Sequence, residues 1–98
     1  MPVILTTTAT LNAGGAASLE RYAAAVMPLI TAAGGRVLLR ATLRETLVGT
    51  DIPDFIAVIQ FPDADRIHAL FDSDAYQAAL SDRRRAFCNL RTFVSDPL

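Results

Sequence analysis

The chain has 98 residues, of which 52% are hydrophobic, and its formal net charge is −1 at pH 7. This length fits a single domain over residues 1–98 and excludes a second independent core. All nine basic residues are arginine and ten residues are acidic, a balance that argues against nucleic-acid binding, which needs a basic face. The apolar run at the N-terminus ends at Leu5, and no segment approaches the roughly 20 apolar residues that cross a bilayer. We therefore expect a cytoplasmic protein without a membrane partner.

The hydrophobic pattern of the first half predicts three elements. Residues 3–11 are rich in β-branched side chains and alternate, as a half-buried strand does. An alanine-rich helix follows and ends at Gly34-Gly35. Pro28 lies inside this helix and predicts a kink or a restart there, because proline lacks the amide donor. Residues 36–48 alternate again and predict a long strand.

The second half predicts three more elements. Residues 55–61 form a nearly continuous apolar run, typical of a strand that is covered on both faces. Asp63 is placed to cap a second helix, and Ser73 can cap a last helical segment that carries Tyr76. Residues 87–94 predict the final strand.

This order, β-α-β-β-α-β, predicts a ferredoxin-like α+β fold: a four-stranded antiparallel sheet with two helices on one face. The strand at 55–61 also places Ile56 and Val58 on the opposite face of the sheet. An exposed apolar face of this kind favours burial against a second copy. We therefore expect a homodimer that packs sheet to sheet.

A set of residues spread over positions 19–94 resembles the DUF1330 family. The resemblance implies a dimeric α+β barrel, a fold whose members include cofactor-free monooxygenases, small isomerases and ligand-sensing domains, so it indicates the fold more than the function. The matching residues are Tyr22, Pro28, Gly34-Gly35-Arg36, Arg40, Phe61-Pro62, Asp72-Ser73, Tyr76-Gln77 and Arg83.

Four of these residues are candidates for a site. Tyr22 and Tyr76 fall on the apolar stripes of their helices, and a buried phenol needs a hydrogen-bond partner. Arg40 lies among the polar positions of its strand, where it needs either a partner such as Glu45 or a wet cavity. The family resemblance singles out Arg83 from three consecutive arginines. Together these groups would make a small pocket for an enol, phenol or carboxylate, or would only tie the helices to the sheet.

Two further residues, His68 and Ser73, are weaker candidates. His68 lies at the edge of the apolar stripe of the second helix, as a surface histidine or as a base that lines a cavity. Ser73 is a nucleophile only if it is not a helix cap, and Cys88 is expected to pack as a small hydrophobic residue. The sequence has no Cys/His cluster with metal-ligand spacing and no glycine-rich phosphate loop, so we expect neither a metal nor a cofactor.

Two classes of function stay open. The first is a cofactor-independent enzyme, of the monooxygenase, isomerase or cyclase type, that acts on a small phenolic, keto/enol or carboxylate compound. The second is a module that binds or senses such a ligand without catalysis. Residue patterns alone do not choose between them, because both need the same pocket.

Overall fold

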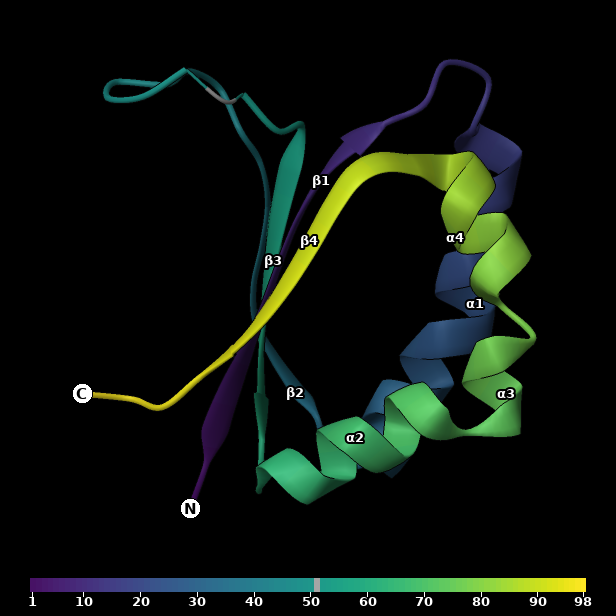
Figure 1. The fold of residues 1–98 in the computed structure, drawn as a ribbon, viewed down its shortest axis with the longest axis vertical. Helices are drawn as coiled ribbons and strands as arrows, with labels where there is room; N and C mark the ends of the chain where they lie inside the picture. Colours follow the sequence, from purple (N-terminus) through teal and green to yellow (C-terminus); the bar gives the residue numbers. More distant parts are fainter. Residues whose placement is uncertain (51) are drawn as a thin grey trace.

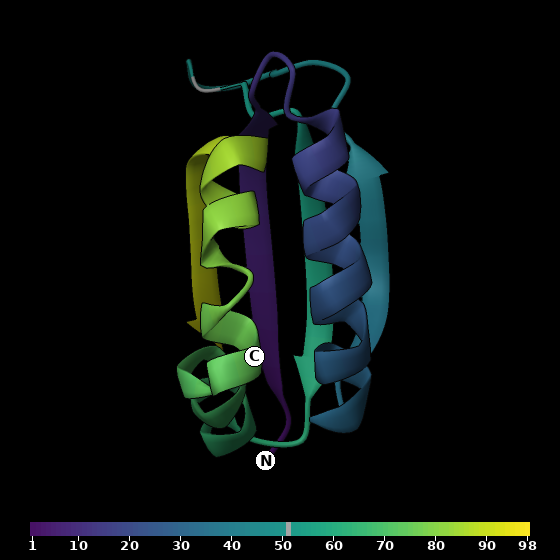
Figure 2. The same cartoon turned by 90° about the vertical axis from the view of Figure 1, so that its right-hand side faces the viewer.

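The computed structural model describes residues 1–50 and 52–98. The strands found there, β1 (Val3–Leu11), β2 (Arg36–Thr42), β3 (Phe55–Phe61) and β4 (Phe87–Ser95), form one antiparallel sheet in the order β2-β3-β1-β4. The helices α1 (Ala16–Ala32), α2 (Ala64–Asp72), α3 (Asp74–Gln77) and α4 (Leu80–Ala86) all lie on one face of this sheet (Figure 1). In this layer α1 runs beside α3 and α4 (Figure 2). The predicted ferredoxin-like α+β fold is confirmed.

Both predicted helix caps are present, and one of them sets the position of a candidate residue. The Asp63 carboxylate accepts a hydrogen bond from the Arg66 amide at 3.0 Å, which starts α2. The Ser73 hydroxyl donates to the Leu70 carbonyl at 2.7 Å and accepts from the Tyr76 amide at 3.1 Å. Ser73 therefore ends α2 and starts α3, and it holds Tyr76 at the first turn of α3.

Helix α1 is continuous, so the predicted restart at Pro28 is wrong. Pro28 is exposed, and Ala24, whose carbonyl loses its partner, is exposed as well. Water can therefore replace the missing hydrogen bond on the outer side of the helix. The helix ends as predicted at Gly34, which has a φ of +83°, a conformation that favours glycine.

Strand β2 is shorter than the predicted strand at 36–48 and ends at Thr42, opposite the first residue of β3. Beyond that pair the chain turns away. The Leu43 amide donates to the Asp54 carbonyl at 2.9 Å, and the Asp54 amide donates to the Ala9 carbonyl at 2.8 Å. Because Pro53 has no amide donor, the sheet ladder cannot continue past this point, and the chain leaves it as a loop.

A β-bulge in β2 changes which side chains face the helices. Val37 pairs with Ile59, but the register shifts before Leu39, so that Arg40 pairs with Ala57. Arg40 therefore lies on the helix side of the sheet, as the candidate pocket requires, whereas an uninterrupted alternation would place it on the other face with the polar side chains. Glu45 lies beyond the end of β2, and no ion pair joins it to Arg40 in the described part of the chain.

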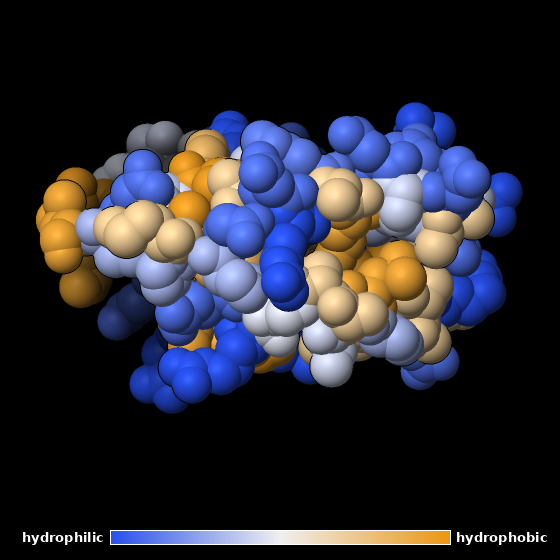
Figure 3. Space-filling view, turned by 90° about the horizontal axis from the view of Figure 1, so that it is seen from below, coloured by the Kyte–Doolittle hydropathy of each residue, from blue (hydrophilic) through white to orange (hydrophobic). Residues whose placement is uncertain are grey.

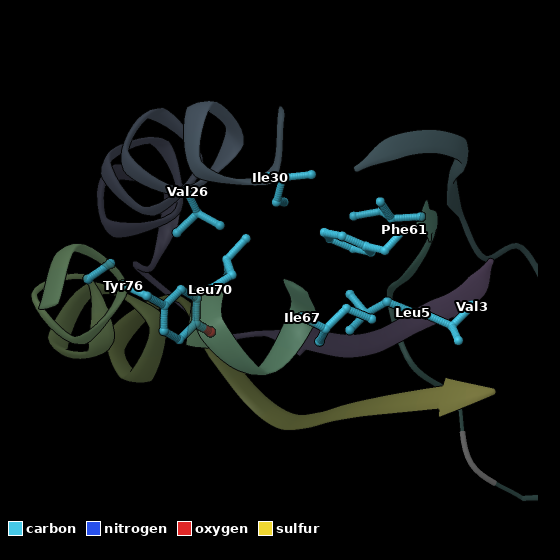
Figure 4. Packing of buried hydrophobic residues seen from close by; sticks show 10 residues of the cluster. Val3, Leu5, Val26, Ile30, Phe61, Ile67, Leu70 and Tyr76 are labelled. Atoms are coloured by element: carbon cyan, nitrogen blue, oxygen red, sulfur yellow. The ribbon is translucent and has the colours of Figure 1, made fainter. Parts of the chain in front are cut away.

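The main core lies between the helices and the sheet. Val26 and Ile30 of α1, Leu70 of α2 and Phe61 of β3 belong to one buried cluster, in which Leu70 points toward the two side chains of α1 (Figure 4). Cys88, in contrast, is exposed on the edge strand β4, so the prediction that it packs as a hydrophobic residue is wrong. None of the helices in the described residues combines the length and the apolar composition needed to span a bilayer.

The face of the sheet opposite the helices is partly apolar and carries no helix (Figure 1). It includes the side chains of Leu39, Ile56, Val58 and Phe93; Ile56 and Val58 are half-buried, whereas Leu39 is 47% and Phe93 55% exposed. The loop that follows β2 and the tail after β4 both extend from the sheet toward this side (Figure 1). We call these residues and their neighbours on that side the open face.

Candidate functional site

A cavity of about 130 Å³ lies between the helix layer and the sheet. Its walls are mostly apolar, and apolar side chains also reach the surface at the end of the molecule that carries α2 (Figure 3). Six of the seven aromatic side chains, all within the described part of the chain, line this cavity: Tyr22, Phe55, Phe61, Phe71, Tyr76 and Phe87.

The cavity exists because small side chains occupy the middle of the sheet. Ala57 of β3 and Thr7 of β1 are paired neighbours on the floor, and Ala23 of α1 also lines the cavity. Larger residues at these positions would bring the helix and sheet layers into contact by filling the space between them.

Three polar side chains form a hydrogen-bonded chain beside the cavity. Tyr22 and Tyr76 line it, whereas Arg83 does not, so the expectation that Arg83 lines the pocket is wrong. Arg83 of α4 donates from Nη1 to the Tyr76 hydroxyl oxygen at 3.0 Å. The Tyr76 hydroxyl, on α3, lies 2.9 Å from the hydroxyl of Tyr22 on α1. The Arg83 guanidinium also lies 5.8 Å from the centre of the Tyr76 ring, within cation–π range. The chain therefore ties three helices to one another rather than to the sheet.

Aromatic neighbours hold the two phenols in place. The Tyr76 ring stacks on Phe71 with 4.7 Å between centroids. The Tyr22 ring meets Phe87 edge-on at 5.8 Å and Tyr76 edge-on at 6.3 Å. Tyr76 is only 2% exposed, so the positions of both hydroxyls are set by packing as well as by hydrogen bonding.

The hydrogen-bonded chain has one donor more than its own contacts use. Arg83 supplies the first hydrogen bond, and one phenolic proton supplies the bond between Tyr76 and Tyr22. Two hydroxyls carry two protons, and no other acceptor within the described residues takes the second one. One phenolic O–H donor is therefore left for an oxygen atom in the cavity that both tyrosines line.

Burial raises the pKa of the Tyr22 hydroxyl well above its ordinary value. The Arg83 charge acts in the opposite direction but is the smaller effect. Tyr22 therefore stays protonated at neutral pH and serves as a donor rather than as a base.

Arg40 lines the same cavity from the sheet side, where the β2 bulge places it. It does not join the hydrogen-bonded chain, and its side chain is exposed. Two cavity residues were missed in the sequence, Thr7 and Thr92, whose hydroxyls share a hydrogen bond of 3.1 Å on the floor. Thr7 shares its odd-numbered register with the apolar residues of its strand, and this register indicates a side chain that faces the helices.

The weaker candidates lie elsewhere. His68 is exposed on α2 and does not line the cavity. Ser73 is a helix cap whose hydroxyl is engaged on both sides. Over the residues that the structure describes, no group of three or more His, Cys, Asp or Glu side chains is arranged to hold a metal ion.

A family model matches most of this sequence. The model of a domain of unknown function, DUF1330, matches residues 7–95. The chain belongs to the DUF1330 family. The resemblance predicted from its motifs is thereby confirmed. Among curated proteins, no sequence matches this chain.

Solved structures show the same fold at low sequence identity. A protein of unknown function from Rhodopseudomonas palustris is 19% identical, with a TM-score of 0.89 over 99% of this chain and 82% of its own. A dimeric ferredoxin-like protein of unknown function from Jannaschia sp. CCS1 is 10% identical, with a TM-score of 0.75 over 99% of this chain and 100% of its own. SnoaB from Streptomyces nogalater, a cofactor-independent oxygenase, is 12% identical, with a TM-score of 0.70 over 99% of this chain and 93% of its own. At these identities the likeness concerns the fold alone.

Proposed function

We propose that this DUF1330 protein binds a small organic compound through an oxygen atom of a phenol, keto/enol or carboxylate group. The unused phenolic proton at the end of the Arg83–Tyr76–Tyr22 chain carries this proposal. Both phenols line a mostly apolar cavity, where a hydrogen bond to an oxygen acceptor on a ligand is electrostatically stronger than it is in bulk water.

The same donors suit an oxygen atom on which negative charge develops. A phenolic donor backed by a guanidinium stabilises an enolate or phenolate more than its neutral form, because the donors are already oriented toward the charge. This favours cofactor-independent oxygenation, isomerisation or cyclisation, and SnoaB, which shares the fold, is described as a cofactor-independent oxygenase. The alternative is a module that binds or senses the ligand without turning it over.

The test is a thermal-shift screen of small phenols, quinones and carboxylic acids, followed by calorimetry on the compounds that bind. We expect Tyr76→Phe and Arg83→Met to weaken binding, because each removes a hydrogen bond from the Arg83–Tyr76–Tyr22 chain. Arg84→Met is the matched control, since Arg84 is an exposed neighbour on the same helix. Equal binding by the double variant Tyr22→Phe/Tyr76→Phe and the wild type would contradict the proposal, because that variant has no phenolic donor in the cavity.

Product analysis then separates the two classes. A bound compound that is consumed, as seen by mass spectrometry after incubation in air, supports an enzyme. A compound whose binding depends on the Arg83–Tyr76–Tyr22 hydrogen bonds and that is recovered unchanged supports the binding module.

We further propose that two copies pair through their open faces. Leu39, Ile56, Val58 and Phe93 give this face an apolar centre, and several proteins that share the fold are described as dimeric. Burial of such a patch stabilises a symmetric dimer. Light scattering at micromolar concentration should give twice the chain mass of 10.5 kDa, and a monodisperse monomer would refute the pairing.

A further inference from the structure

One transverse row of the sheet carries the polar floor of the cavity. Arg40 of β2 pairs with Ala57 of β3, Ala57 pairs with Thr7 of β1, and Thr7 pairs with Thr92 of β4. All four side chains line the cavity. Because neighbouring strands lie about 4.8 Å apart, this row leads from a charged side chain at one edge, across small side chains, to a hydroxyl pair.

Arg40 is a cation with no counter-charge among the residues that the structure describes. In the described residues no carboxylate or carbonyl oxygen contacts its guanidinium, and its side chain is exposed on an edge strand. The guanidinium therefore lies where the cavity meets solvent. A planar guanidinium in this position matches a carboxylate, with which it can form two parallel hydrogen bonds.

The hydrogen-bonded chain on the helix side has a preferred direction. Arg83 donates to the Tyr76 oxygen, and this charge-assisted bond polarises the Tyr76 hydroxyl, which makes Tyr76 the better donor of the two phenols. Across the 2.9 Å contact either hydroxyl could be the donor, and this polarisation favours donation from Tyr76 to Tyr22. The proton left over is that of Tyr22, which also lines the cavity.

The size and lining of the cavity limit what lies between these two ends. At about 130 Å³ it is close to the engineered cavity of roughly 150 Å³ that holds benzene. The walls carry aromatic rings from the sheet and from three helices, Phe55 and Tyr76 among them. One aromatic ring fits this space by volume and by edge or stacking contacts.

We propose that the ligand is a single-ring aromatic carboxylate with a second oxygen on the far side of the ring, the class to which hydroxybenzoates belong. Its carboxylate pairs with Arg40 at the mouth, its ring lies over Ala57, and its second oxygen accepts the Tyr22 proton. This inference rests on the proposed function and narrows it to one ligand class with two recognised ends.

The experiment is calorimetric titration of the full chain with 4-hydroxybenzoate, benzoate and phenol. We expect wild-type protein to bind 4-hydroxybenzoate at least about tenfold more tightly than either fragment, because each fragment lacks one end. Arg40→Met should weaken both acids by about tenfold and leave phenol unchanged. Tyr22→Phe should weaken 4-hydroxybenzoate and phenol but not benzoate. The matched control is Arg36→Met, an exposed arginine of the same strand that pairs with Gln60 on the open face.

The outcomes separate this inference from the proposed function. If 4-hydroxybenzoate binds no more tightly than phenol, or if Arg40→Met retains full affinity for it, the two-ended recognition is refuted while oxygen binding at Tyr22 stands. If none of the three compounds binds and no other small phenol or acid binds, the proposed function fails as well. The comparison of the three ligands on wild-type protein needs no variant, so a Tyr22→Phe protein that folds poorly does not affect it.

Discussion

The cavity predicts that an alanine-to-valine substitution has opposite effects on stability at two positions on the same face of the sheet. Ala57 is half-buried on the cavity floor, where there is space beside its methyl group. Ala9 is fully buried on the neighbouring strand and is packed in a small cluster with Phe87 and Ala86. Valine at both positions therefore tests whether the space beside Ala57 is real.

Ala57→Val adds two carbon atoms that can occupy the cavity. At about 0.8 kcal/mol for each buried CH₂ group, the free energy of unfolding rises by up to about 1.6 kcal/mol. A β-branched side chain is also favoured in a strand. Ala9→Val has no such space, and overpacking of a filled core lowers the free energy of unfolding by about 1–3 kcal/mol.

Equilibrium urea unfolding of both variants at one protein concentration measures the two changes. The midpoint should rise for Ala57→Val and fall for Ala9→Val, with the slopes unchanged. Titration with 4-hydroxybenzoate should show lost binding for Ala57→Val, because the valine takes the place of the ring. A midpoint that falls equally for both variants would show that the cavity offers no usable space.

Three further predictions concern the phenols and the open face. Above the ordinary tyrosine pKa of 10.0, the unfolded protein releases the Tyr22 proton that the folded protein keeps. The free energy of unfolding therefore falls by up to about 1.4 kcal/mol for each further pH unit. Urea unfolding of Tyr22→Phe over the same pH range should lack this contribution. Tyr76→Phe leaves Arg83 and Tyr22 without their shared partner and should lower the free energy of unfolding by about 1–2 kcal/mol at pH 7 in the same assay. Val58→Asp places a charge in the centre of the open face and should give a folded monomer by light scattering and circular dichroism, and a dimer that persists would rule out this face as the interface.

The fold could be predicted because its signals are local. The alternation of residues 3–11, the apolar run of 55–61 and the caps at Asp63 and Ser73 each depend on neighbours in sequence, and each is found in the structure. Pro28 misled because its effect depends on exposure: a proline on the solvent side of a helix leaves a carbonyl that water can reach. Exposure is a property of the folded chain and cannot be read from neighbours in sequence.

The site could be predicted only in part, for a similar reason. Tyr22 and Tyr76 follow from the apolar stripes of their helices, whereas Arg83 was distinguished from Arg84 by the family resemblance alone. The direction of Arg40 depends on a bulge that no residue in β2 announces, because a bulge is set by pairing with β3. Thr7 stands in the cavity for a comparable reason: its neighbours on the floor are assigned by the register of three strand pairs.

An unfilled space of this size is a disadvantage to a small domain unless it has a use. A space of about 130 Å³ removes packing contacts from the core, although folded proteins have only about 5–15 kcal/mol of stability. Simple packing would favour larger residues than Ala57 and Thr7 on the floor. Instead, the space is bordered on one side by a phenolic donor and on the other by a guanidinium that has no carboxylate partner within the described part of the chain. Donors placed around a space that packing would otherwise fill are what a ligand with oxygen at both ends requires.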